Sequence, residues 1–409
     1  MTTDKPKGEF GLDAQPESTA EYLRSKWINI KTGDVGSAPI VVGIVLILII
    51  FRSLSENYLT AFNVVNMQLQ AAGLVTIAIG VVFILLIAEI DLAIAFNSGI
   101  AGVLTVLLLR PDVAGWPWWA AILAGLVTSS LLSLVMGLIV TRAGVPSFVV
   151  TLAGNLALSG IVLILTTQFS QAGTIRIEDP IVVGIAGTFM APAVSWILLA
   201  LGLALSALLT YRTMQIRTKQ GLATTPMPVV LTTYAGVTAV AAVIIGYSNT
   251  DRGVPLLALI VGGFLWFWTF MLQRTRFGRH VLAIGGNPEA ARRAGINVER
   301  VRVIVFTLAG FMAGAGGIIL ASRLRSVSPS AGGGSLLLDV IAAAVIGGTS
   351  LFGGRGRVSS ALLGALVITL INNGMDGLGL NSGVKFVVTG LVLLGAVLLD
   401  ALSNRRSTS

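Results

Sequence analysis

Residues 71–88 read AAGLVTIAIGVVFILLIA, a stretch without a single charged side chain. An α-helix rises 1.5 Å per residue, so about 20 apolar residues cross the ~30 Å hydrocarbon core of a bilayer. Further apolar runs recur along the chain, and some of them are shorter. They predict helices near 38–54, 71–88, 96–109, 118–140, 146–166, 194–212, 228–247, 254–273, 301–322, 337–350, 358–374 and 384–402. The expected fold class is an all-α polytopic membrane protein with about 10–12 transmembrane helices, some of them discontinuous.

The composition agrees with a membrane protein and excludes several kinds of chemistry. Of 409 residues, 55% are hydrophobic and 11% are charged, whereas soluble domains have about 45–50% and about 25%. The chain has no cysteine and a single histidine, His280, so disulfides, thiolate metal sites and Cys/His catalytic pairs are excluded. No Gly-x-Ser-x-Gly elbow is present. We therefore expect no metal site, no cofactor in this chain and no enzymatic activity.

The basic residues indicate how the chain is oriented. The net charge is +9, but most of the arginines lie in short loops between apolar runs, which is typical of topology signals and not of nucleic-acid binding. Seven arginines fall between Arg274 and Arg302, so this loop is expected in the cytoplasm. Counting spans outward places both termini there too. The predicted domains are an N-terminal tail, 1–37, a transmembrane domain, 38–403, with a cytoplasmic loop at 274–300, and a C-terminal tail, 404–409. The same count of spans places Arg323 and Arg325 on the outer side of the membrane.

Two polar or glycine-rich stretches interrupt the apolar pattern. Residues 88–92 read AEIDL, and residues 346–357 read IGGTSLFGGRGR. Carboxylates at membrane depth are costly, so Glu89 and Asp91 either lie at the cytoplasmic interface, with Asp91 capping the next helix, or line a polar path. Non-helical backbone within a membrane is tolerated only where protein or water satisfies it. The two interruptions therefore point to the translocation region.

The cytoplasmic loop contains a short helix signal. Residues 285–300 read GGNPEAARRAGINVER. Asn287 suits the N-cap, Pro288 the first helical position and Gly295 the residue after the helix. A helix over 288–294 is expected, and because two turns alone are marginal in water, it needs a surface to rest on. The alternative is a basic loop that only sets topology.

This loop resembles the EAA loop of ABC importer permeases, in which Glu-Ala-Ala is followed by three further residues and then by Gly. The matching residues are Glu289, Ala290, Ala291 and Gly295. Other segments resemble the monosaccharide branch of that family, and the extra pair of spans near 194–247 is similar to its xylose type. They are AEIDL at 88–92, VPSFVVTLAGNLALSGI at 145–161, RTRFGRHVLAIGGNPEAARRAGINVERV at 274–301, SRLRSVSPSAG at 322–332 and VIGGTSLFGG at 345–354.

The resemblance implies a multi-pass permease in a bacterial inner membrane that imports a monosaccharide, xylose or a related pentose. Its partners would be a second permease copy, two ATP-binding cassette subunits and an extracytoplasmic sugar-binding protein. ATP and Mg²⁺ would be bound by the cassette subunits, since no Gly-x-x-x-x-Gly-Lys-[Ser/Thr] loop occurs here. The four EAA-like residues would couple to the ATPase, with Ala290 and Ala291 small enough to enter a cleft on it. Candidate path residues are Glu89, Asp91, Asn155, Arg323 and Asp339.

An ion-coupled secondary sugar transporter is the main alternative, with Glu89 and Asp91 carrying protons or sodium. The capped helix at 288–294 argues against it, because such a carrier needs no docking helix. For Arg323 two interpretations stand: a salt bridge with Asp339, or contact with the binding protein or the mouth of the path.

Overall fold

The computed structural model describes residues 38–170, 173–220, 222 and 224–408. Most of these residues are helical and very few are in strands, which confirms the all-α membrane fold. They form two compact units: the larger runs to Phe189 and resumes from Pro255 to Arg405, and the smaller is Met190–Val254. The tail predicted at 1–37 lies outside the described residues.

All twelve predicted runs are helices. In the larger unit these are α2 (Ala38–Leu54), α3 (Ala61–Leu86), α4 (Ile94–Leu109), α5 (Trp118–Ala143), α6 (Ser147–Gln168), α10 (Leu256–Arg274), α13 (Val298–Leu324), α14 (Leu336–Ile346), α15 (Ser359–Gly377) and α16 (Ser382–Thr408). Three shorter helices join them: α7 (Pro180–Gly187), α11 (Arg276–Gly286) and α12 (Pro288–Arg293). Helix α16 continues through residues 404–408, which the sequence assigned to the tail.

Helix α3 begins ten residues before the apolar run at 71. Thr60 caps it by accepting a hydrogen bond from the Asn63 N–H at 3.4 Å. The early turns are polar, and their amides find partners inside the protein: Asn63 donates to Asn373 Oδ1 at 2.8 Å and accepts from Asn373 Nδ2 at 3.1 Å. Because this pairing satisfies the amides, the helix extends beyond its hydrophobic part.

Seven helices within the described part of the chain have the length and apolar composition needed to cross a membrane. Others are shorter: α4 has 16 residues and α14 has 11, which correspond to roughly 24 and 16 Å at 1.5 Å per residue. Neither length reaches across the ~30 Å hydrocarbon core. The expectation that some spans are discontinuous is therefore confirmed.

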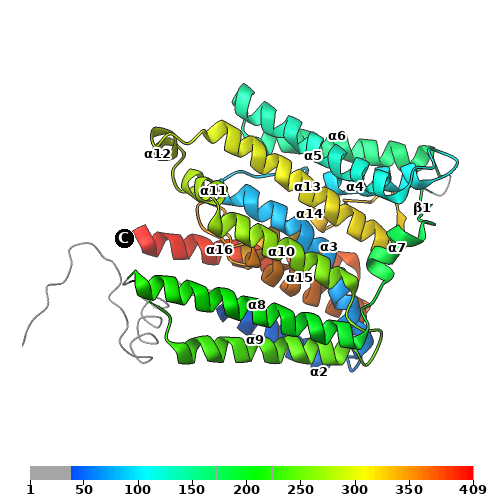
Figure 1. Ribbon diagram of the computed structural model, residues 1–409. Coiled ribbons are helices and arrows are strands. Elements are labelled where there is room, and N and C mark those ends of the chain that lie inside the picture. Colours follow the sequence, from blue (N-terminus) through cyan, green and yellow to red (C-terminus); the bar gives the residue numbers. More distant parts are fainter. Residues whose placement is uncertain (1–37, 171–172, 221, 223, 409) are drawn as a thin grey trace, which may run out of the picture. The chain divides into compact units, whose positions relative to one another are not determined.

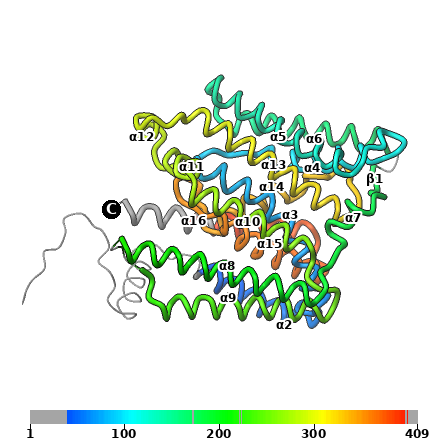
Figure 2. The backbone as a smooth tube through the Cα atoms, in the orientation of Figure 1, coloured from blue at the N-terminus to red at the C-terminus, as the bar shows by residue number. Residues whose placement is uncertain are grey.

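Helices α3 and α13 form the buried centre of the larger unit, and α13 packs against α3, α4 and α5 (Figure 1, Figure 2). Close approach to α5 depends on small side chains, which let backbones meet in membrane proteins. A Cβ atom at Gly310 of α13 would lie only 2.6 Å from Ser133 Cβ. The small residues of α5 that face inward recur every fourth position: Ala121, Gly125, Ser129, Ser133 and Gly137.

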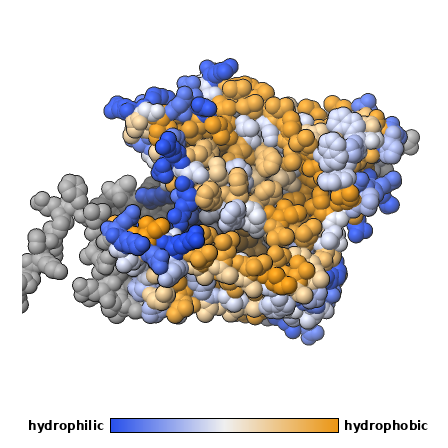
Figure 3. Space-filling model, viewed as in Figure 1, coloured by the Kyte–Doolittle hydropathy of each residue, from blue (hydrophilic) through white to orange (hydrophobic). Residues whose placement is uncertain are grey.

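The two ends of the larger unit are different. Helices α11 and α12 lie at one end, and the antiparallel pair of β1 (Ile175–Arg176) with β2 (Ser326–Val327) lies at the other (Figure 1). On the face drawn in Figure 3, apolar side chains cover the sides of the helices, and hydrophilic residues gather around α11 and α12 and again at the β-strand end. Arg325 lies at the β-strand end, where its carbonyl accepts from the Ile177 N–H at 3.0 Å. Arg325 and the loop at 274–300 therefore lie at opposite ends of the larger unit (Figure 1).

The smaller unit is a helical hairpin of α8 (Pro192–Lys219) and α9 (Met227–Ser248). Thr210 and Tyr234 join the two helices by a hydroxyl–hydroxyl hydrogen bond of 2.9 Å. At the open end, the Met190 N–H donates to the Val254 carbonyl at 2.8 Å. Most of its apolar side chains are exposed, as expected for helices that face lipid.

The tight α5–α13 contact predicts that Gly310→Val destabilises the protein. Added methyl groups would clash with Ser133, and overpacking costs about 1–3 kcal/mol. The midpoint of thermal unfolding in detergent should fall. Gly263→Val on α10 is the matched control, because nothing lies within 4 Å of its Cβ position. Equal midpoints for the two variants would contradict this account of the packing.

Candidate functional site

A non-helical segment separates α3 from α4 and confirms the interruption predicted at 88–92. It comprises residues 87–93, and Ala88 within it has a positive φ of 58°. One of the two roles expected of Asp91 is to cap the next helix, and its carboxylate bonds the backbone at the start of that helix. The N-cap of α4 is Ala93, and Asp91 Oδ1 accepts from the Ala93 backbone N–H at 2.9 Å. Asp91 therefore bonds backbone N–H groups where α4 begins, at Ala93 and at Ile94, the first residue of the helix.

Three polar residues of α6 hold this segment. Ser147, Thr151 and Asn155 recur every fourth position and therefore share one face of the helix. The Ile90 N–H donates to Ser147 Oγ at 3.2 Å, and Thr151 Oγ1 donates to the Ile90 carbonyl at 3.3 Å. Asn155 Nδ2 donates to the Leu92 carbonyl at 2.5 Å. The polar face of α6 thus supplies partners that a broken helix in a membrane needs.

The two carboxylates of the segment have different surroundings. Glu89 Oε1 lies 3.1 Å from Arg302 Nε of α13. The contact is an ion pair and not a hydrogen bond, because Arg302 Nε has no aligned hydrogen-bond partner. Asp91 is buried, and its Oδ2 has no partner among the described residues. Sequence reasoning missed Arg302, which it counted only among the topology-setting arginines.

A second non-helical segment, residues 328–335, runs from β2 to α14 and falls in the gap between the helices predicted at 301–322 and 337–350, although it was not singled out from the sequence as an interruption. It lies against the start of α4, where the position of a Cβ at Gly99 would coincide with the Ala331 carbonyl. Gly332 has a φ of 81°, a region that glycine adopts readily. The stretch SPSAGGGS at 328–335 was the available signal, because clustered Ser, Pro and Gly interrupt helices.

Asp339 lies in the first turn of α14, directly after this segment, and is buried. Its Oδ2 accepts from Ser335 Oγ at 2.8 Å and from Asn372 Nδ2 at 3.3 Å, while its Oδ1 has no partner. Among the described residues no ion pair joins Asp339 to Arg323. The predicted salt bridge between them is therefore wrong.

A third non-helical segment, residues 347–358, confirms the interruption predicted at 346–357. It returns to the end of α3, where the Gly354 N–H donates to the Leu86 carbonyl at 3.0 Å. The last turn of α11 reaches the same point. A Cβ at Gly285 would overlap both the Leu86 carbonyl and the Gly354 nitrogen. Three chain segments thus meet backbone to backbone.

The short helix in the basic loop is confirmed. It is α12, Pro288–Arg293, and it ends one residue before the predicted end. Asn287 Oδ1 accepts from the Ala290 N–H at 3.0 Å, which is the predicted N-cap. Gly295 has a φ of 82°, as expected for the residue that ends a helix in the left-handed conformation.

The two alanines of this loop point in different directions. Ala290 is exposed, whereas Ala291 is 4% exposed and belongs to the main hydrophobic core of the chain. The expectation that both present a surface to a partner is therefore wrong for Ala291. Glu289 is exposed and forms an ion pair with Arg292 at 2.7 Å. The short helix was expected to need a surface to rest on, and the buried Ala291 side chain makes this contact with the core of the chain.

The predicted path residues fall into separate groups. Glu89, Asp91 and Asn155 come together at the segment 87–93. Asp339 belongs to a different polar cluster with Ser335 and Asn372. Arg323 lies half-buried near the end of α13, close in sequence to β2.

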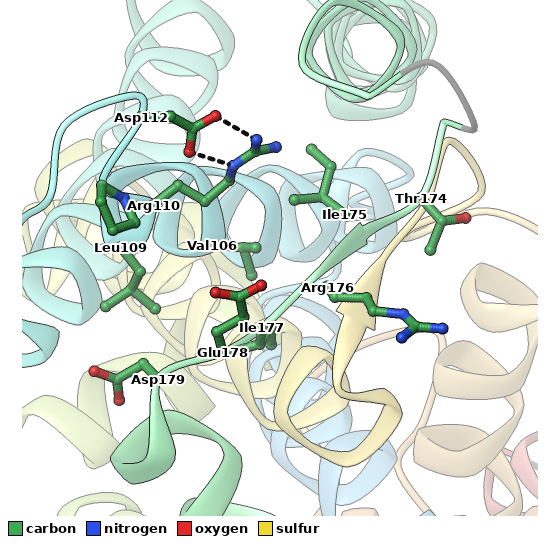
Figure 4. Close-up of a pocket in the computed structure, with 11 residues that line it drawn as sticks. Val106, Leu109, Arg110, Asp112, Thr174, Ile175, Arg176, Ile177, Glu178 and Asp179 are labelled. Atoms are coloured by element: carbon green, nitrogen blue, oxygen red, sulfur yellow. Dashed lines mark hydrogen bonds and ion pairs between the residues drawn. The ribbon is translucent and has the colours of Figure 1, made fainter.

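A pocket of about 260 Å³ opens at the β-strand end. Figure 4 shows the Arg110 and Asp112 side chains turned toward each other, and Arg110 Nε donates to Asp112 Oδ1 at 2.9 Å. This hydrogen bond raises the pKa of the Arg110 guanidinium and lowers the pKa of the Asp112 carboxyl. The remaining polar lining consists of Thr174, Arg176, Glu178 and Asp179.

Comparison with known proteins gives consistent matches. The family described as "Branched-chain amino acid transport system / permease component" matches residues 63–401. The xylose transport system permease protein XylH of Escherichia coli K12 is 37% identical over 369 residues, which cover 90% of this chain and 92% of that protein. The ribose import permease protein RbsC of the same strain is 30% identical over 390 residues, 95% of this chain and 99% of that protein. No solved structure matches.

Because the polar face of α6 holds the segment 87–93, we predict that Asn155→Ala lowers the stability of the folded protein. The change leaves the Leu92 carbonyl without its donor, and an unsatisfied buried group costs about 1–3 kcal/mol. Thermal unfolding should occur at lower temperature than in the wild type. Ser159→Ala, one turn further along the same face, removes only a bond to the Leu156 carbonyl of its own helix and should have little effect. If the two variants unfolded alike, α6 would not be what holds the segment.

Proposed function

The chain belongs to the family of membrane permease components whose members include the xylose and ribose permeases, and on this basis we propose that it is the membrane-spanning subunit of an ABC importer for a monosaccharide. Proteins of this kind work with ATP-binding and substrate-binding partners. The proposed sugar is xylose or a related pentose, because identity to the xylose permease is 37% and to the ribose permease 30%.

The observation that carries the proposal is the capped helix α12. It stands at one end of the larger unit, its N-cap is formed by Asn287, and Ala291 anchors it to the core. Glu289, Ala290 and Gly295 remain exposed, and they form the surface proposed to dock on a cassette subunit. That subunit would bind ATP and Mg²⁺, since this chain contains no phosphate-binding loop.

The translocation path is proposed to run past the non-helical segments. Helices α4 and α14 are too short to span a bilayer and begin next to segments 87–93 and 328–335. Broken helices of this kind mark substrate sites in membrane transporters. Glu89, Asp91, Asn155 and Asp339 belong to this region, and the unpaired oxygens of Asp91 and Asp339 are acceptors for sugar hydroxyls in a rearranged state.

The remaining partners are assigned by position. The end that carries β1, β2, Arg323 and Arg325 would face the sugar-binding protein, outside a bacterial inner membrane. The end that carries α12 would face the cytoplasm together with both termini. A second copy of the chain would complete a homodimer.

Transport energetics tests the proposal and its alternative. The chain is reconstituted in liposomes with its cassette subunits and binding protein, and uptake of labelled xylose is followed with and without enclosed ATP. We expect ATP-dependent accumulation. Accumulation by the chain alone, driven by a sodium or proton gradient, would falsify the importer and support the ion-coupled carrier that uses Glu89 and Asp91.

The burial of Ala291 yields a matched pair of variants. Ala290→Trp should leave the fold intact, because its side chain is exposed, but should obstruct docking and weaken cassette binding about tenfold or more. Ala291→Trp should instead overpack the chain itself and lower the midpoint of thermal unfolding. Co-purification and unfolding are measured for both. Native retention of the ATPase by Ala290→Trp would show that α12 is not the docking surface.

A further inference from the structure

The end of α11, the end of α3 and the segment 347–358 meet at one point where no side chain separates them. We call the contact of Gly285, Leu86 and Gly354 the glycine junction. Its hydrogen bond runs from the Gly354 N–H to the Leu86 carbonyl at 3.0 Å. Neighbouring Gly353 is also confined, though less than Gly285, since a Cβ there would lie 2.8 Å from both Ala88 Cβ and the Gly285 carbonyl oxygen.

The absence of side chains makes the glycine junction stiff. Side chains can change rotamer and absorb a small displacement, whereas backbone in close contact has no such freedom. Gly354 also has a φ of 70°, a left-handed conformation that favours glycine. A shift of α11 by a fraction of an ångström must therefore move the end of α3 or the segment 347–358.

The glycine junction is directly connected to α12. Helix α11 ends at Gly286, and only Asn287, the N-cap, stands between it and α12. On the other side, the Ile296 N–H donates to the Ala291 carbonyl at 3.1 Å, and the chain enters α13 at Val298. Because Ala291 and Val298 are both buried, pressure on the exposed face of α12 reaches α11 and α13 together.

A second contact ties the other end of the loop to the same broken segment. Arg302, early in α13, pairs with Glu89 at 3.1 Å. Glu89 lies three residues after Leu86, the residue of α3 in the glycine junction. Both sides of the loop that carries α12 therefore contact the non-helical segment 87–93 or the residue just before it.

We propose that the glycine junction and the Glu89–Arg302 pair transmit the movement of α12 to the non-helical segments of the translocation path. This inference rests on the proposed importer function and names the positioning residues that link ATP hydrolysis to transport. Glu89 then acts as one half of a mechanical link and carries no coupling ion.

The glycine junction is tested by Gly285→Ala against Gly286→Ala. The control is adjacent in sequence, and nothing lies within 4 Å of its Cβ position. The measured quantity is sugar taken up per ATP hydrolysed in liposomes containing the assembled complex. Gly285→Ala should retain the cassette subunits and hydrolyse ATP, but its uptake per ATP should fall about fivefold or more, the lower end of typical couplings between sites. Gly286→Ala should match the wild type. A native ratio in Gly285→Ala would overturn the proposal.

The ion pair supplies a second test that does not depend on the folding of the glycine variant. Glu89→Arg should lower uptake per ATP, and Glu89→Arg combined with Arg302→Glu should recover a substantial part of it, because the pair is restored with its charges exchanged. No effect of the single variant, or no recovery in the double variant, would overturn the role of the pair. Failure of the importer function is distinguishable, since the wild type would then show no ATP-driven uptake at all.

Discussion

The requirement that every backbone polar group inside a membrane find a partner governs this structure. Helices meet it internally, but the chain leaves the helix at 87–93, 328–335 and 347–358. At the first of these, Ser147 and Asn155 of α6 bond the Ile90 N–H and the Leu92 carbonyl. The third is joined to α3 through Gly354. At these two segments, side chains or backbone groups of a neighbouring helix supply hydrogen-bond partners for the irregular backbone.

Small residues make those neighbours available, because they let the helices approach. The buried face of α5 repeats Ala, Gly or Ser every fourth position and accommodates Gly310 of α13. The lack of a side chain at Gly285 likewise allows the end of α11 to contact Leu86 and Gly354. Tightly packed interiors transmit strain with little compression, so this contact would make the proposed link between the loop at 274–300 and the non-helical segments stiff. In this proposal, close packing and coupling depend on the same glycines.

Electrostatics distinguishes the three carboxylates that lie in or beside the non-helical segments, Glu89, Asp91 and Asp339. Glu89 has a cationic partner in Arg302, so its charge is balanced and its position is defined. Asp91 and Asp339 each have one oxygen bonded and one without a partner. Both lie where a short helix begins, at α4 and α14, and a helix N-terminus favours negative charge. The helix dipoles therefore help to explain how two carboxylates persist in a mostly apolar bundle without an ion pair.

The sequence by itself determined the twelve helical runs, the interruptions at 88–92 and 346–357, and the capped helix that begins after Asn287. Each depends on properties local to the chain, namely the length of an apolar run, the preference of glycine for turns and the geometry of a cap. Only the tertiary structure decided that Ala291 is buried while Ala290 is exposed, that Arg302 is the partner of Glu89, and that Asp339 bonds Ser335 and Asn372. It also decided that the segment 328–335 packs against α4 and that Gly285, Leu86 and Gly354 meet. These features depend on residues far apart in sequence, whose proximity arises from helix packing and leaves no local pattern by which a partner is identified.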